Sequence, residues 1–203
     1  MKIILASSSP NREELLTRMG FQFEVVHPTF EERIDVTVSP EKQIQHFALE
    51  KAKSVFQKFS TLDDVMIMGF DSMIDFKGTS VGKPRTKKAA FEMIQSFIGK
   101  SQRVSTGIAL VGRWEGEYFE KVSVVHSPVK FRSDITDDQI YRYLEFGDWK
   151  GKCGAYSILG TGMFFLESID GDFQNIVGIP VLKMGEMIRE VTGKSPVWVM
   201  EPK

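Results

Sequence analysis

The sequence has few of the residues that build disulfide frameworks or soft-metal centres. Its 203 residues include one cysteine, Cys153, and three histidines at positions 27, 46 and 126. A lone cysteine excludes an intramolecular disulfide, and the wide spacing of the histidines leaves no Cys/His zinc motif. We therefore expect a protein of a reducing, cytoplasmic compartment.

Long apolar runs and an excess of charge of one sign are also missing. The chain carries 26 Lys and Arg against 27 Asp and Glu, a net charge of −1, so no overall field attracts it to nucleic acid or anionic lipid. No stretch approaches the roughly 18 apolar residues of a membrane span, and the first apolar run, residues 3–6, is too short for a signal sequence. We expect no membrane attachment and no stable nucleic-acid partner.

Enough apolar residues are present for a folded core. The hydrophobic fraction is 42%, and neither a repeat nor a long linker divides the chain. This favours a single domain over residues 1–203. We expect that domain to consist of two interleaved lobes around a cleft. Strand and helix periodicities are mixed throughout, which is typical of an α/β fold with a mixed sheet and flanking helices. The patterns predict strands over 3–5, 21–26, 65–74, 103–111, 118–125 and 163–169, with a hairpin turn at 114–116. They predict helices over 10–19, 40–59, 87–97, 137–146 and 181–191, with Ser39 and Thr86 as caps and Thr136 with Gln139 as a capping box.

The segment "SSSPNREELL" lies where the first predicted strand meets the first predicted helix. A helix N-terminus presents unpaired backbone N–H groups, so nearby hydroxyls and a guanidinium can complete an anion pocket. Ser7, Ser9 and Arg12 would be its donors. In the alternative interpretation, Ser9 only caps the helix and Arg12 is a solvated side chain.

Asp71 stands inside the apolar run "VMIMGFDSMI". An unpaired buried carboxylate is costly, so a lysine, a metal ion or a raised pKa should accompany it, unless Asp71 lies in a turn between two strands. Lys83 lies between Gly82 and Pro84, in a rigid loop that could aim its ammonium group. The loop is not a nucleotide-binding P-loop, because one residue is missing between the glycines and a proline replaces the magnesium-binding Ser or Thr.

Glu32 and Lys51 are weaker signals on their own. Glu31 and Glu32 stand in a polar connection, where adjacent carboxylates usually form a solvated loop. Lys51 lies beside an apolar helix stripe, where a lysine usually extends its ammonium group to water. Neither Glu32 nor Lys51 indicates a function by itself. They become informative when all the motifs are taken in their order along the chain.

Taken in that order, the motifs resemble the Maf family of nucleoside triphosphate pyrophosphatases almost end to end. "LASSSPNREELL" is similar to the family's Leu-Ala-Ser-x-Ser-Pro-Arg-Arg-x-Glu-Leu-Leu opening. The later blocks "LEKA", "GFDS", "GKP", "GAY" and "GDFQNIVGIP" follow in the family's sequence. The resemblance implies an elongated, two-lobed fold of the inosine-triphosphatase type with a central cleft. It also implies hydrolysis between the α- and β-phosphates with a divalent cation, Mg²⁺ by preference and Mn²⁺ or Co²⁺ as alternatives.

The resemblance also implies that Asp71 accepts the proton of the attacking water. Releasing pyrophosphate requires water at the α-phosphorus, neutralisation of several negative charges and in-line geometry. The hypothesis distributes these tasks over seven side chains: Ser7, Ser9 and Arg12 on phosphate oxygens, Lys51 and Lys83 as neutralising cations, and Glu32 with Asp71 on the metal.

The residues that distinguish the family's branches depart from both known signatures. The branch acting on dTTP and UTP carries Arg, Thr and Gln where this chain has Asn11, Ser72 and Leu159, and the 7-methyl-GTP branch carries Trp, Gln and Glu. Gln102 also stands where the pyrimidine branch often has His. Losing one hydrogen-bond partner costs roughly tenfold in discrimination, so the resemblance leaves the preferred base open. An alternative is that Leu159 packs in the core and never meets substrate.

Other functional classes stay open beside the pyrophosphatase hypothesis. A non-catalytic nucleotide-binding regulator of cell division would keep the phosphate pocket without turnover. A serine hydrolase is disfavoured because no Gly-x-Ser-x-Gly elbow is present. The expected partner is a nucleoside triphosphate substrate, and association into a homodimer is left open.

Overall fold

A computed structural model describes residues 1–35 and 37–199, and it confirms the predicted α/β class. No helix in these residues combines the length and hydropathy needed to cross a membrane. The strands are β1 (Lys2–Ala6), β2 (Glu24–Val26), β3 (Val65–Phe76), β4 (Thr79–Val81), β5 (Ser101–Trp114), β6 (Glu117–Phe131) and β7 (Leu166–Ile169). The helices are α1 (Pro10–Arg18), α2 (Pro40–Phe56), α3 (Lys87–Phe97), α4 (Asp137–Phe146), α5 (Phe173–Val177), α6 (Val181–Thr192) and α7 (Pro196–Val199), with 3₁₀ segments η1 (Gln57–Phe59), η2 (Cys153–Ala155) and η3 (Thr161–Phe165).

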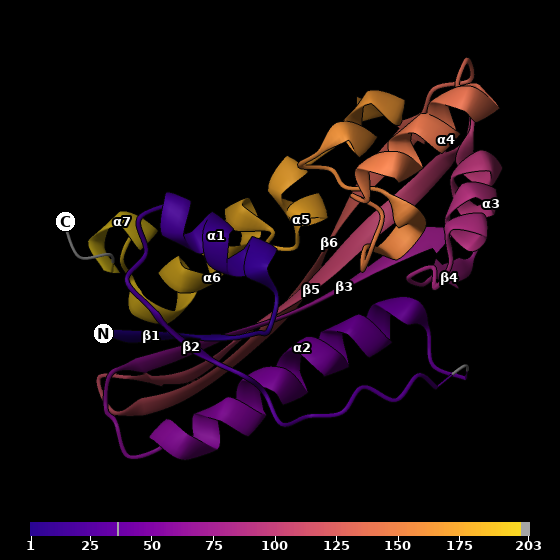
Figure 1. The fold of residues 1–203 in the computed structure, drawn as a ribbon. Helices are drawn as coiled ribbons and strands as arrows, with labels where there is room; N and C mark the ends of the chain where they lie inside the picture. Colours follow the sequence, from indigo (N-terminus) through magenta and orange to yellow (C-terminus); the bar gives the residue numbers. More distant parts are fainter. Residues whose placement is uncertain (36, 200–203) are drawn as a thin grey trace. The chain divides into compact units, whose positions relative to one another are not determined.

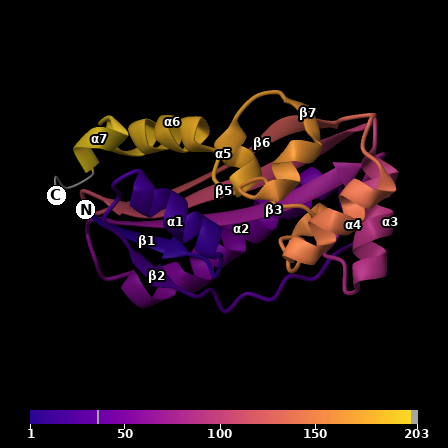
Figure 2. The ribbon, with the colours of Figure 1, turned by 45° about the horizontal axis from the view of Figure 1, so that its top comes forward.

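The sheet is mixed. Its seven strands follow the order β2-β1-β3-β5-β6-β7, with β4 on β3 (Figure 2). β1 pairs in parallel with β2 and β3, whereas β4 and β7 are antiparallel to their neighbours. The turn between β5 and β6 places Glu115 and Gly116 at φ 52° and 81°, the left-handed pair that matches the twist of a hairpin. The predicted hairpin is confirmed.

The described chain forms two compact units with interleaved segments. The first unit contains the described residues of Met1–Ser72, Thr106–Val125 and Gly178–Lys203, and the second contains Met73–Ser105 and His126–Val177. β3, β5 and β6 each contribute residues to both units.

In the first unit, helices cover both faces of the strands (Figure 1). Met66, Met68 and Phe70 of β3 pack with the apolar side chains of α1 and α6 on one face. Ile67 belongs to the cluster that β3 forms with α2 on the other face. Gly69 permits this contact with α2, because a Cβ there would lie 2.2 Å from the Ala48 carbonyl oxygen. The close approach brings α2, which carries Lys51, against the strand that carries Asp71.

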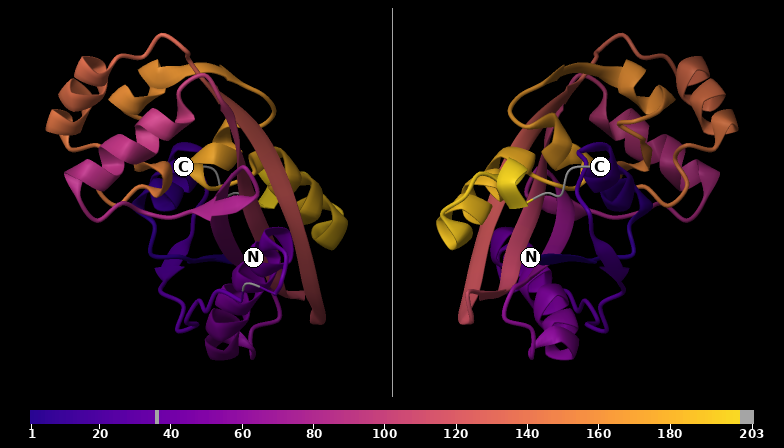
Figure 3. Two further views of the ribbon diagram at one scale, coloured as in Figure 1. Left: turned by 90° about the vertical axis from the view of Figure 1, so that its right-hand side faces the viewer. Right: turned by 90° about the vertical axis from the view of Figure 1, so that its left-hand side faces the viewer.

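In the second unit, α3 and α4 lie side by side (Figure 3), and aromatic rings fill the core. Phe97 contacts Phe76 and Phe131, with ring centroids 4.9 and 5.2 Å apart, and Phe131 contacts Tyr156 at 5.1 Å. These rings connect β3, α3 and β6 to the chain just after η2.

Several of the predicted elements have other bounds in the structure. The strand predicted over 163–169 begins only at Leu166, because Thr161–Phe165 forms a 3₁₀ turn. The strand predicted over 21–26 is limited to Glu24–Val26, where pairing with β1 occurs. The helix predicted to Phe59 ends at Phe56 and continues as the separate 3₁₀ turn η1.

Candidate active site

The candidate site lies at the carboxyl end of β1, beside the middle of the parallel strand β3. The last paired residues of the two strands are Ala6 and Gly69, so Asp71 stands two residues beyond the end of β1. The chain leaves β1 through the serine turn, Ser7–Ser9, and enters α1 at Pro10. In open α/β sheets, ligands bind outside the carboxyl ends of the strands.

Asp71, Lys51 and Glu32 form one charged cluster. Lys51 Nζ lies 2.6 Å from Asp71 Oδ1 and 2.5 Å from Glu32 Oε1. Lys51 and Asp71 are 9% and 8% exposed, whereas the Glu32 side chain is half-exposed. The prediction that a cation faces Asp71 is confirmed. The alternative that Asp71 occupies a turn is wrong, because it lies within β3.

The environment of Asp71 shifts its proton affinity upward. Burial raises the pKa of the Asp71 carboxyl, opposed by the positive charge and hydrogen bond of Lys51. The Glu32 charge raises the same pKa further, and the Arg12 charge lowers it. A carboxylate with a raised pKa is a stronger proton acceptor than a solvated one.

In the serine turn, Ser7–Ser9, the hydroxyl of the N-cap residue Ser9 does not cap α1. Ser7 is buried, and its Oγ accepts hydrogen bonds from Ser9 N at 3.1 Å and from Arg12 Nη1 at 3.4 Å. Ser9 has the backbone conformation of a helix N-cap, but its side chain makes no capping hydrogen bond. Ser9 is therefore the N-cap residue by position, and its role in binding phosphate stays a prediction.

Arg12 is half-buried and bonded to protein atoms, so the solvated alternative is wrong for this residue. Its Nε donates to the Gly178 carbonyl at 3.0 Å, and its Nη1 donates to the Phe70 carbonyl at 3.1 Å. Nη2 donates to Ser72 Oγ at 3.0 Å. Sequence reasoning missed the Gly178 and Phe70 carbonyls, which lie 166 and 58 positions away and carry no side-chain signal.

The other site residues predicted from the sequence lie in different units: Asn11 in the first, and Lys83 and Leu159 in the second. Asn11 is half-buried on the first turn of α1. Lys83, in the second unit, is exposed after β4, and the preceding Gly82 carbonyl accepts a hydrogen bond from Gly154 N at 3.2 Å. Leu159 is 53% exposed, so the alternative that it is a core residue is wrong. The structure thus gathers the candidates of the first unit, and the roles of Lys83 and Leu159 stay predictions.

Gln102 has a structural partner in the second unit. Its Nε2 donates to the Tyr156 hydroxyl at 2.7 Å, and both side chains are buried. Burial raises the pKa of the Tyr156 hydroxyl, so that group stays protonated and able to donate. Gln102 therefore supports the "GAY" block from within the core.

A comparison with known families decides where the chain belongs. The family model described as "Maf-like protein" matches residues 2–191. The chain belongs to the Maf family. The matched range contains every predicted site residue, from Ser7 to Leu159.

Two curated relatives of this Maf-family chain are both named dTTP/UTP pyrophosphatase. The protein from Pyrococcus horikoshii is 39% identical over 189 residues, which cover 93% of this chain and 96% of the relative. The protein from Caldicellulosiruptor saccharolyticus is 34% identical over 194 residues, which cover 94% of each chain. Among solved structures, a nucleoside-triphosphatase / dITP/XTP pyrophosphatase from Mycobacterium abscessus aligns with a TM-score of 0.40 and 17% identity, over 66% of this chain and 75% of that one.

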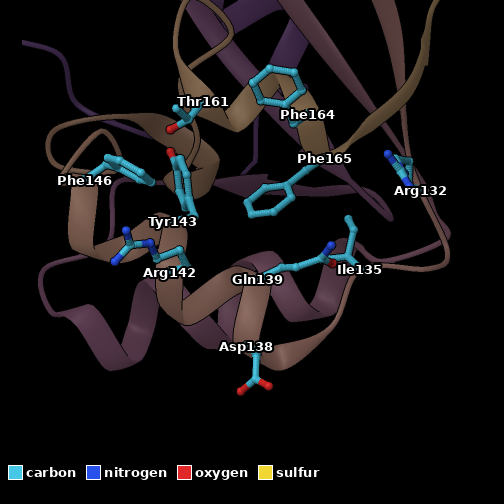
Figure 4. Close-up of a pocket in the computed structure, with 10 residues that line it drawn as sticks. All are labelled: Arg132, Ile135, Asp138, Gln139, Arg142, Tyr143, Phe146, Thr161, Phe164 and Phe165. Atoms are coloured by element: carbon cyan, nitrogen blue, oxygen red, sulfur yellow. The ribbon is translucent and has the colours of Figure 1, made fainter.

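Two cavities lie apart from the predicted residues of this Maf-family site. One of about 430 Å³ lies in the second unit between α4 and η3 (Figure 4), where the Tyr143 and Phe165 rings meet edge to face at 5.0 Å. The other, of about 980 Å³, lies in the first unit between α2 and the loop before it, and Phe30, Lys42 and His46 are among its lining residues. No predicted site residue lines either cavity.

The donor set of the charged cluster suits a hard cation. Glu32 and Asp71 offer carboxylate oxygens, the ligands that Mg²⁺ prefers over nitrogen and sulfur. Within the described ranges, no three His, Cys, Asp or Glu side chains gather as a metal site. A cation held by these two carboxylates would need further oxygens from substrate or water.

Proposed function

We propose that the protein hydrolyses nucleoside triphosphates between the α- and β-phosphates, giving a nucleoside monophosphate and pyrophosphate. The observation that carries this proposal is the buried Asp71 bound to Lys51, on β3 beside the carboxyl end of the parallel strand β1, where the serine turn begins. The names of the relatives support it, since both are pyrophosphatases of dTTP and UTP.

In this mechanism Asp71 orients the attacking water and takes its proton. Lys51 compensates the negative charge around Asp71, and the hydroxyls of Ser7 and Ser9 donate to phosphate oxygens. Lys83 neutralises further phosphate charge. Glu32 and Asp71 would hold a Mg²⁺ ion, which supplies charge neutralisation for the triphosphate when it is bound.

The proposed function is tested by product analysis on a panel of canonical, methylated and deaminated triphosphates. We expect equal amounts of monophosphate and pyrophosphate from at least one of them. Pyrophosphate is detected as orthophosphate that appears only after inorganic pyrophosphatase is added. Nucleotide binding without any turnover would instead identify a regulator, and orthophosphate release without the second enzyme would contradict cleavage at the α-phosphate.

Glu32→Gln is expected to raise the Mg²⁺ concentration for half-maximal activity about tenfold, because one of two charged oxygen ligands becomes neutral. The measurement is a Mg²⁺ titration after treatment with EDTA. The matched control is Glu31→Gln, since the Glu31 side chain is 83% exposed and pairs with the exposed Arg33 at 3.6 Å. Equal Mg²⁺ titrations for the two variants, or full wild-type activity in excess EDTA, would contradict this metal assignment.

Leu159→Gln is expected to raise the ratio of kcat/KM for UTP over GTP about tenfold, because an amide returns where the pyrimidine branch carries one. Leu159 is 53% exposed, so the substitution should leave the melting temperature unchanged. The control is Leu182→Gln on α6, a leucine that is 74% exposed. An unchanged ratio would remove Leu159 from base recognition.

A further inference from the structure

The guanidinium of Arg12 uses nearly all of its hydrogen-bond donors on protein atoms. A guanidinium carries five N–H groups. Four are used here: Nε on the Gly178 carbonyl, Nη1 on the Phe70 carbonyl and on Ser7 Oγ, and Nη2 on Ser72 Oγ. One N–H is left, so Arg12 cannot offer a phosphate the paired donors of a bidentate contact without breaking these bonds.

The acceptors of Arg12 flank Asp71. Phe70 and Ser72 are its two neighbours on β3, and side chains alternate along a strand, so Asp71 and Ser72 point to opposite faces. Lys51 holds Asp71 from the face covered by α2. Arg12 holds the neighbouring residues from the face covered by α1. Residues 70–72 of β3, which include the proposed general base Asp71, are therefore held from both faces of the sheet.

Two further observations show that the residues around the Arg12 guanidinium suit these hydrogen bonds. Ser72 Oγ lies 2.8 Å from Thr106 Oγ1 of β5, so the Arg12 hydrogen bond continues to the next strand. Gly178 has φ +120°, and a Cβ there would approach Arg12 Nε to 3.1 Å. A residue with a side chain at 178 would be strained and would crowd the guanidinium.

We infer that Arg12 is a positioning residue, which holds the Phe70 carbonyl and the Ser72 hydroxyl on either side of Asp71 and does not bind the triphosphate. This inference rests on the proposed function for the role of Asp71. It replaces the sequence-based expectation that Arg12 holds phosphate oxygens. It also places Ser72 in the same hydrogen-bond network, because its hydroxyl already bonds Arg12 and Thr106.

The kinetic test compares Arg12→Lys and Arg12→Gln. A lysine keeps the charge but cannot reach four acceptors, so both variants should lower kcat about 30-fold and change KM for the triphosphate less than about threefold. A phosphate ligand would behave differently: KM would rise tenfold or more in Arg12→Gln, and Arg12→Lys would restore most of the loss. That second pattern would overturn the inference. The matched control is Arg18→Gln, at the other end of α1, where Arg18 pairs with the exposed Glu14.

Ser72→Ala provides a milder variant that removes a single acceptor of Arg12. A positioning network predicts that kcat falls about threefold and by the same factor for every base. If Ser72 reads the base instead, the ratio between UTP and GTP changes while kcat for the preferred base is kept. A changed ratio of that kind would contradict the role given to Ser72.

A third measurement requires no turnover. Amide hydrogen exchange of residues 70–72 in the nucleotide-free protein should be at least tenfold faster in Arg12→Gln than in wild type and unchanged in Arg18→Gln, because the Arg12 contacts limit local opening. Unchanged exchange in Arg12→Gln would overturn the inference. If wild type forms no pyrophosphate, the proposed function fails, and this exchange result still decides whether Arg12 fixes the strand.

Discussion

Asp71→Asn is expected to lower kcat about 10³-fold, because the amide has nearly the shape of the carboxylate but cannot take a proton from water. The geometry supports a folded variant: the amide oxygen can still accept the hydrogen bond from Lys51 Nζ, which is 2.6 Å from Asp71 Oδ1. Turnover is measured with the triphosphate that wild type hydrolyses fastest, beside the melting temperature. A folded Asp71→Asn protein with wild-type turnover would remove Asp71 from the mechanism.

The matched control is Asp75→Asn on the same strand. Asp75 accepts a hydrogen bond from Arg103 Nη2 at 2.9 Å, and its side chain is 19% exposed. It carries the same carboxylate and an ion pair of its own, but its partners are Arg103 and Gly78 N rather than Lys51. We expect less than a twofold change in kcat for this variant, which separates the chemistry of Asp71 from a general effect of losing charge on β3.

Lys51→Met is expected to lower the free energy of unfolding by about 3 kcal/mol, because removal of the cation leaves Asp71 buried without its partner. Glu32 contributes less to this loss, since its half-exposed side chain can turn to water. The same variant should lose activity, because the negative charge around Asp71 would no longer be compensated. Urea unfolding followed by circular dichroism measures the change.

The control for Lys51 is Lys53→Met, two residues further along α2. Lys53 Nζ lies 2.9 Å from Glu120 Oε2, and the two side chains are 37% and 33% exposed. A partly solvated pair of this kind contributes less than about 1 kcal/mol. The double variant Lys51→Met with Asp71→Asn should recover part of the stability, because no carboxylate then remains buried at position 71. Equal losses for Lys51→Met and Lys53→Met would contradict a stabilising role of the buried pair.

The sequence was sufficient where the determining residues are close neighbours in the chain. The predicted capping box of α4 is confirmed, because the Thr136 side chain and the Gln139 side chain bond each other's backbone within four residues. The predicted caps Ser39 and Thr86 are confirmed in the same way. Predictions were wrong where a short apolar run fits several conformations, as at Thr161–Phe165, which forms a 3₁₀ turn and not a strand.

The sequence by itself also determined the family, because its motif blocks occur in a fixed order across residues 2–191. From those blocks it predicted Ser7, Lys51 and Asp71 as site residues, and the structure brings Lys51 and Asp71 into contact. It could not decide whether Leu159 is buried, because a leucine suits the core and the surface of a turn alike.

Only the tertiary structure decided what Arg12 contacts. Its acceptors lie 5, 58, 60 and 166 positions away in the chain, and two of them are backbone carbonyls that no residue type reveals. They meet because the parallel register places the end of β1 beside β3 and because α1 packs back on that face. Hydrogen bonds depend on distances in space, so a role made of such long-range contacts is set by strand register and packing, not by the residues around Arg12.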